Sequence, residues 1–187
     1  MKKYSAYLIL AFVALALSQC RNAGRKDSTE TAKETNEKKE LSSEEQADFL
    51  VEAASSGIWE VEMAKLAEEK AQHARVKSFA KLMRDEHSKL NEEIRSLAAK
   101  KQLTLPGVLD PDHQDHLAEL KRLSGKDFDR RLIEMMEKEH ENDIKDFEDA
   151  SENHKDSDIQ TFAAKTLPLL RAHLDSVKMI RTAIGGR

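Results

Sequence analysis

A regular spacing of core-type positions, in alternating steps of four and three residues, runs through two long stretches of the chain. The first stretch carries it at Val76, Ala80, Met83, His87, Leu90, Ile94, Leu97 and Lys101. The second carries it at Ile159, Ala163, Thr166, Leu170, His173, Val177 and Ile180. Steps that average 3.5 residues keep one side of an α-helix against a partner helix. The pattern therefore predicts an all-α fold, and six Gly with three Pro are too few for the turns of a many-stranded β fold.

Four long helices and one short helix follow from this periodicity and its capping signals. We expect long helices over 43–72, 76–101 and 158–183. Another long helix starts after a Ser124 cap and carries its apolar seam through Phe147. A short helix over 111–123 opens with Asp110 as its N-cap and Pro111 at its first position, and it ends at Leu123. These helices predict a four-helix bundle.

The lengths of the connections constrain the topology of this bundle. The first and second long helices, and likewise the third and fourth, are separated by a few residues, which predicts two antiparallel hairpins. More than twenty residues, including the short helix, join the two hairpins. That length permits a crossover along the bundle, which is the ferritin-like arrangement. A compact excursion at one end of the bundle is the alternative.

The N-terminus has the pattern of an export signal. Lys2 and Lys3 precede an unbroken apolar run from Tyr7 to Leu17, which is too short to span a bilayer. Cys20, the only cysteine, follows at once and resembles the lipidated cysteine of a bacterial lipobox, although Gln19 stands where a small residue usually does. We interpret 1–19 as a lipoprotein signal peptide. The alternative is an ordinary cleaved signal that ends near a cysteine.

The stretch behind the cysteine is strongly polar. Residues 20–43 contain Leu41 as their only large apolar side chain, so we expect a disordered tether between the lipid at Cys20 and a folded domain at 44–184. This predicts a protein of the bacterial cell envelope, anchored by lipid, facing the periplasm and held at the outer membrane. The net charge of −4 gives no reason to expect nucleic acid as a partner.

Three histidines stand at seam positions where Leu or Ile would be expected. His87, His140 and His173 lie on three different helices, and Glu60 lies at the edge of the inward stripe of the fourth. A rise of about 1.5 Å per residue places all four within about a turn of one level in the crossover topology. Glu137 precedes His140 by three residues on the same helix. These five side chains are candidate ligands for zinc, iron or copper.

Two hypotheses of different class fit these residues. In the first, the bundle binds a metal that it stores, buffers or uses in redox chemistry. In the second, the protein is a non-catalytic structural or interaction lipoprotein whose buried histidines bond to one another and fix the helix register. Ferritin-type di-iron chemistry needs Glu-x-x-His on two helices, but Arg84 and Leu170 stand at that spacing before two of the histidines. The sequence therefore assigns no catalytic residue.

Several stretches of the chain are similar to a known family. They are AASSGIWEVEMAKLA, VKSFAKLMRDEHSKLNEEI, LDPDHQDHLAELKRLSGKDFD and FAAKTLPLLRAHL, and the similarity extends over about 44–182. They resemble the ferritin-like domain of unknown function numbered 4142, which is common among bacterial exported proteins. The resemblance implies a ferritin-like four-helix bundle in the cell envelope. The polar positions typical of that family match Glu60, His87, His140 and His173.

Overall fold

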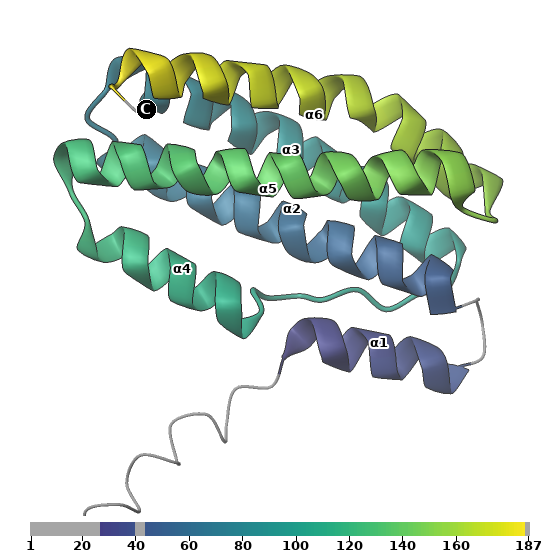
Figure 1. Ribbon diagram of the computed structural model, residues 1–187. Helices are drawn as coiled ribbons and strands as arrows, with labels where there is room; N and C mark the ends of the chain where they lie inside the picture. The colour runs from purple at the N-terminus through teal and green to yellow at the C-terminus, as the bar shows by residue number, and fades with distance from the viewer. Residues whose placement is uncertain (1–26, 40–43, 186–187) are drawn as a thin grey trace, which may run out of the picture.

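The computed structural model describes residues 27–39 and 44–185, and the helices in this part of the chain follow one another in the order shown in Figure 1. They are α1 (Ser28–Lys39), α2 (Glu44–Lys70), α3 (Ala74–Lys100), α4 (Pro111–Arg122), α5 (Gly125–Asn153) and α6 (Ser157–Ala183). The long helices predicted from the sequence correspond to α2, α3, α5 and α6, with ends within about three residues of those expected. Asp110 caps α4 as predicted, because its side chain accepts a hydrogen bond from the amide of His113.

The four long helices form a bundle of two antiparallel hairpins, α2 with α3 and α5 with α6. At one end, the carboxylate of Asp129 on α5 accepts hydrogen bonds from the amides of Gln72 and His73 in the α2–α3 turn. At the other end, Lys101 after α3 pairs with Asp156 before α6. The start of α5 therefore lies beside the start of α3, so the two helices run parallel. The connection that carries α4 crosses the length of the bundle, which decides between the two topologies that the sequence left open.

The core consists of two apolar clusters, one toward each end of the bundle. The cluster near the α2–α3 turn includes Trp59, Met63, Val76, Met83, Phe128, Met136 and Val177. The cluster near the α5–α6 turn includes Leu50, Ile94, Phe147, Ile159, Phe162 and Leu170. On α3, α5 and α6 the two sets are separated by two to three turns, which carry the buried polar residues His87, Asn91, His140, Asp143 and His173. On α2 the interval is shorter and carries Ser55 and Ser56, with Glu60 just beyond it. A polar layer therefore divides the core at mid-bundle.

Helix α1 corrects the expectation of a disordered tether over 20–43. Its Thr29, Ala32 and Asn36 are at most 7 % exposed, because α1 packs along α2. Asn36 forms two hydrogen bonds with the backbone of Thr104 in the crossover, one to the carbonyl at 2.9 Å and one from the amide at 2.7 Å. The segment contains little apolar surface, so it docks through small side chains and amide hydrogen bonds. Contacts of this kind leave no periodic pattern of apolar residues in the sequence.

The other expectations for the N-terminus fall outside the structure. The signal peptide at 1–19, Cys20 and the remainder of the expected tether outside α1 lie beyond the described residues. Among the helices that are described, none combines the length and apolar character needed to cross a membrane.

The docking of α1 yields a first prediction, on the substitution Asn36→Ala. This change removes two hydrogen bonds to the half-buried backbone of Thr104, each worth about 0.5–1.5 kcal/mol, so we expect a loss of about 1–3 kcal/mol in the free energy of unfolding. Urea denaturation followed by circular dichroism measures it. Thr35→Ala is the control, because the Thr35 hydroxyl donates to the carbonyl of Thr31 within the same helix. Equal stabilities of the two variants would show that α1 does not contribute to the folded domain.

Candidate metal centre

The buried polar layer is built around three imidazole rings from three helices. His87 on α3, His140 on α5 and His173 on α6 are each at most 2 % exposed. One ring nitrogen from each can be chosen so that all three lie within 4.8 Å of one another. The rings also pack at centroid distances of 5.2–5.5 Å. The structure therefore brings together the three seam histidines that the sequence singled out.

The outward nitrogen of each ring is held by an oxygen of the surrounding protein. His140 Nδ1 donates to the carbonyl of Met136, one turn back on α5, at 2.9 Å. His87 Nδ1 lies 2.5 Å from Glu60 Oε2 on α2, and His173 Nε2 lies 2.5 Å from Glu86 Oε2 on α3. Metal-binding histidines are typically oriented in this way by a carboxylate or carbonyl on the second ring nitrogen.

The inward nitrogens face one another and are incompletely paired. His140 Nε2 is buried and has no hydrogen-bond partner. Its other nitrogen donates to a carbonyl, so in the neutral ring Nε2 carries a lone pair. His87 Nε2 and His173 Nδ1 are 3.2 Å apart. When Glu60 and Glu86 are both ionised, His87 Nδ1–H donates a hydrogen bond to Glu60 and His173 Nε2–H donates one to Glu86. The lone pairs of His87 Nε2, His173 Nδ1 and His140 Nε2 then face one another.

Electrostatics keep the rings neutral at pH 7. Burial lowers the pKa of His87 to about 4, and it also lowers the pKa of His140 and His173 against the opposing effect of Glu60 and Glu86. Burial raises the pKa of Glu60 to about 7, although the neighbouring histidines oppose the shift. Neutral imidazole is the form that binds a metal.

The two predicted carboxylates differ in their placement. Glu60 joins the layer, with Oε2 on His87 and Oε1 3.4 Å from Nδ1 of His140. Glu137 pairs instead with Arg181 of α6, at 2.7 Å between Oε2 and Nη1. Within the described part of the chain, the group whose ligand atoms converge consists of the three histidines, and neither Glu60 nor Glu137 belongs to it.

Three further polar residues of this layer were missed by the sequence reasoning. Glu86 directly precedes His87, so it does not share its helix face, yet it reaches His173 across the α3–α6 contact. Asn91 and Asp143, both at most 8 % exposed, lie one turn beyond His87 and His140 respectively. A signal for these two was present, because a polar residue recurs one turn after each of two seam histidines, on the same helix face.

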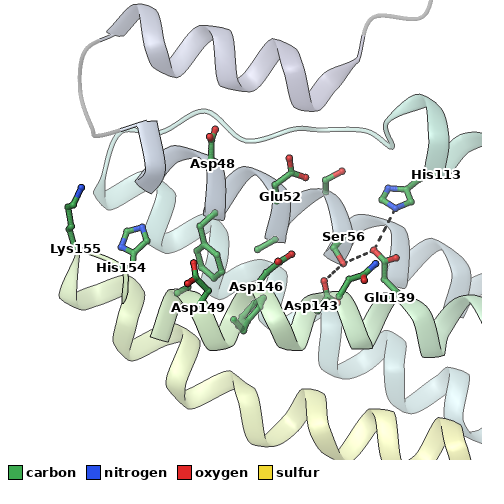
Figure 2. A pocket seen from close by; sticks show the side chains of 16 residues that line it. Asp48, Glu52, Ser56, His113, Glu139, Asp143, Asp146, Asp149, His154 and Lys155 are labelled. Atoms are coloured by element: carbon green, nitrogen blue, oxygen red, sulfur yellow. Dashed lines mark hydrogen bonds and ion pairs between the residues drawn. The ribbon is translucent and has the colours of Figure 1, made fainter. Parts of the chain in front are cut away.

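A hollow of about 850 Å³ opens beside the layer between α2 and α5 (Figure 2). Its carboxylates are Asp48, Glu52, Glu139, Asp143, Asp146 and Asp149, and its basic side chains are His113, His154 and Lys155. We refer to this feature as the acidic groove. At its inner edge the Ser56 hydroxyl lies 2.9 Å from Asp143 Oδ1 and 3.2 Å from Glu139 Oε1. Burial raises the pKa of Asp143 well above its usual value, and the nearby Glu60 and Glu139 add to the shift.

The fold and this geometry define a class, namely a four-helix bundle with one crossover and a buried three-histidine cluster. By its sequence the chain belongs to the family described as Domain of unknown function (DUF4142), whose profile matches residues 30–180. The matched range begins within α1, which agrees with the docking of that helix. No curated protein shows significant similarity to the chain.

Solved structures of another family of unknown function share the fold. The crystal structure of a DUF305 fragment from Deinococcus radiodurans is 13 % identical, covers 73 % of this chain and 94 % of its own, and has a TM-score of 0.64. A DUF305 protein from Streptomyces coelicolor, named as a predicted secreted protein, is 12 % identical, covers 75 % and 94 %, and has a TM-score of 0.61. At these identities the likeness shows the bundle fold alone.

The rim of the acidic groove yields a second prediction, on the protonation of His113. Burial lowers its pKa, but the carboxylates of Glu139 and Asp110 outweigh burial and hold it above the ordinary 6.5. Trp59, the only tryptophan, stacks on this ring at 5.1 Å between centroids and reports its charge through fluorescence. We expect a fluorescence titration with a midpoint above pH 6.5 that is lowered in Glu139→Gln. Both are measured in a His116→Gln background, because the His116 ring also lies 6.0 Å from Trp59 between centroids.

The same shift fixes the sign of a stability effect. Because folding raises the pKa of His113, its protonation contributes to the free energy of unfolding. This contribution is fully present below about pH 6.5 and is lost as the pH rises through the pKa of the folded state. The difference in unfolding free energy between the wild type and His113→Gln should therefore shrink over that interval. A midpoint at or below 6.5 would contradict the expected effect of the two carboxylates.

Proposed function

We propose that this protein is a metal-binding bundle of the bacterial cell envelope, in which His87, His140 and His173 bind one transition-metal ion. The observation that carries the proposal is the bare Nε2 of His140, which is buried, has no hydrogen-bond partner and belongs to the three-histidine group. A buried acceptor without a partner costs about 1–3 kcal/mol. A metal ion that accepts this lone pair removes that cost.

The ligand chemistry suits zinc, copper or iron. Imidazole nitrogens favour these metals, whereas magnesium and calcium prefer oxygen. Glu60 and Glu86 orient two of the rings through their outer nitrogens, and the Met136 carbonyl orients the third. In this arrangement Glu60 acts through His87, so its role is positioning. Three protein ligands leave a coordination position open, as in catalytic zinc sites, but nothing among the described residues selects a reaction.

A specific arrangement of protons favours the alternative, a purely structural layer. When Glu60 carries a proton, it donates to His87 Nδ1, His87 Nε2 donates to His173 Nδ1, and His173 Nε2 donates to Glu86. This chain satisfies both rings without a metal. It leaves His140 Nε2 unpaired in either protonation state of Glu60, which is why the metal-binding function is preferred.

The proposed location rests on the sequence. A basic start, a short apolar run and the single Cys20 support export and lipidation, with 1–19 removed and the domain held by a lipid in the membrane. The outer membrane, with the domain facing the periplasm, is the proposed site. The DUF305 relative of the same fold that is named as secreted is consistent with an exported protein.

A third prediction concerns metal content. We expect the full chain, purified in detergent without a polyhistidine tag and reconstituted with zinc, to hold about one zinc ion per chain by elemental analysis. His140→Ala and His173→Ala should each lose it, because two imidazoles remain in place of three. His116→Ala is the matched control, since that exposed histidine lies on α4 outside the cluster.

The same experiment tests the alternative. A helical wild type that holds no zinc, copper or iron after reconstitution would rule out the metal site. A loss of helical structure in His140→Ala without any metal in the wild type would assign the histidines to a structural layer.

A fourth prediction concerns the anchor. A bacterium that expresses the chain with an alkyne-labelled fatty acid in its medium should label the wild type but not Cys20→Ser. Mass spectrometry should find the mature chain beginning at Cys20. An unlabelled wild type, or a mature N-terminus at another residue, would instead indicate an ordinary cleaved signal peptide.

A further inference from the structure

A small second cavity lies next to the histidine cluster, on the side toward the α5–α6 turn. Its volume of about 10 Å³ is close to the space needed by one water molecule or ion. The polar groups in its lining come from Ser56, Glu60, His87, Asn91 and Asp143, and the remaining lining residues are apolar apart from Gly57. We refer to it as the inner cavity.

Two buried oxygen atoms from this lining have no hydrogen-bond partner. They are Oε1 of Glu60 and Oδ1 of Asn91, on side chains that are 2 % and 6 % exposed. The orientation of the amide is fixed, because its Nδ2 donates to the carbonyl of Gly57 at 2.9 Å. The amide oxygen of Asn91 can only accept, and the Glu60 oxygen accepts when its carboxyl group is ionised, so a neighbouring donor or a cation would satisfy both.

The other polar groups of the lining do not supply that donor. The Ser56 hydroxyl has a single hydrogen, and two carboxyl oxygens compete for it, Oδ1 of Asp143 at 2.9 Å and Oε1 of Glu139 at 3.2 Å. His87 Nδ1 is already engaged with the other oxygen of Glu60. Asp143 adds a second carboxylate, which is 8 % exposed. The polar lining of the inner cavity therefore consists mainly of oxygen atoms, from the carboxyl groups of Glu60 and Asp143, the amide of Asn91 and the hydroxyl of Ser56.

The inner cavity adjoins the acidic groove. Ala53, Ser56, Asp143 and Phe147 line both, so only these side chains separate the two. Figure 2 shows Ser56, Asp143 and Glu139 joined by dashed lines at the inner edge of the groove. A surface lined with carboxylates raises the local concentration of cations. Cations from the solvent are thus concentrated on the exposed side of the inner cavity.

We propose that the inner cavity is a second cation site, in which oxygens of Glu60, Asn91 and Asp143 bind a hard divalent cation such as Mn²⁺. Carboxylate and amide oxygens suit Mg²⁺ and Mn²⁺, whereas the three imidazoles suit softer metals, so the two neighbouring sites select different ions. This site goes beyond the function proposed above and stands whether or not the histidines bind a metal.

Gly57 gives the site a structural signature that does not involve a ligand side chain. A Cβ placed on Gly57 would lie 1.9 Å from Oδ1 of Asn91. Glycine is therefore required for the amide to reach this position against α2. Gly57→Ala should displace the Asn91 oxygen while leaving every candidate ligand in the sequence.

The fifth prediction uses Mn²⁺, whose free ion has an electron paramagnetic resonance signal that decreases on binding. The full chain in detergent is first saturated with Zn²⁺, so that the histidine site is occupied, and is then titrated with Mn²⁺. We expect one Mn²⁺ per chain. Asp143→Asn and Gly57→Ala should each weaken binding by at least about tenfold. Asp149→Asn, in the groove but outside the inner cavity, should bind as the wild type does.

Each result bears on one site. Absence of Mn²⁺ binding, or equal weakening by Asp143→Asn and Asp149→Asn, would overturn the second site and leave a water in the cavity or an ion loosely held by the groove. Asp143→Asn keeps the shape of the side chain and carries the test if circular dichroism shows that Gly57→Ala does not fold. Zinc bound without manganese contradicts only the second site, and manganese bound by a protein that holds no zinc, copper or iron contradicts only the histidine site.

Discussion

The burial of a polar layer in the middle of an apolar core is the constraint on which the rest of this structure depends. Three imidazoles and the Glu60 carboxylate are removed from water at a cost that only hydrogen bonds or a bound cation can offset. The two apolar clusters on either side, one around Trp59 and one around Phe147, hold the helices together and so make that burial possible. In return the layer favours one register, because any axial slip of a helix would separate its polar partners.

The helices and their order could be predicted from sequence because they depend on local signals. The seam spacing, the Asp110 cap and the short turns gave elements that the structure reproduces. The convergence of His87, His140 and His173 could also be predicted, since a fixed rise per residue converts distance along a helix into height. The sequence left open whether the long connection crosses the bundle or stays at one end. The length of a loop limits the distance that it can span but does not determine the direction in which it runs.

The remaining features depend on how each helix is rotated and on what lies beside it. The sequence proposed Glu137 as an additional ligand beside Glu60, but in the structure Glu137 pairs with Arg181 whereas Glu60 contacts His87 and His140. Helix α1 docks through Asn36 and small residues, and so it leaves no apolar signature. The net charge of −4 likewise conceals the acidic groove, because total charge carries no information about how carboxylates gather on one face.

The division of the histidines between the hairpins has a consequence for the order in which the protein assembles. One ring belongs to the α2–α3 hairpin and two belong to the α5–α6 hairpin, so neither hairpin alone holds the set. Contacts within a hairpin are local in sequence and form early, whereas docking of the hairpins must wait for closure of the crossover. Until the hairpins dock, at most two of the three cluster imidazoles can therefore lie together. Under the proposed function, the complete metal site would form only in molecules that have finished folding.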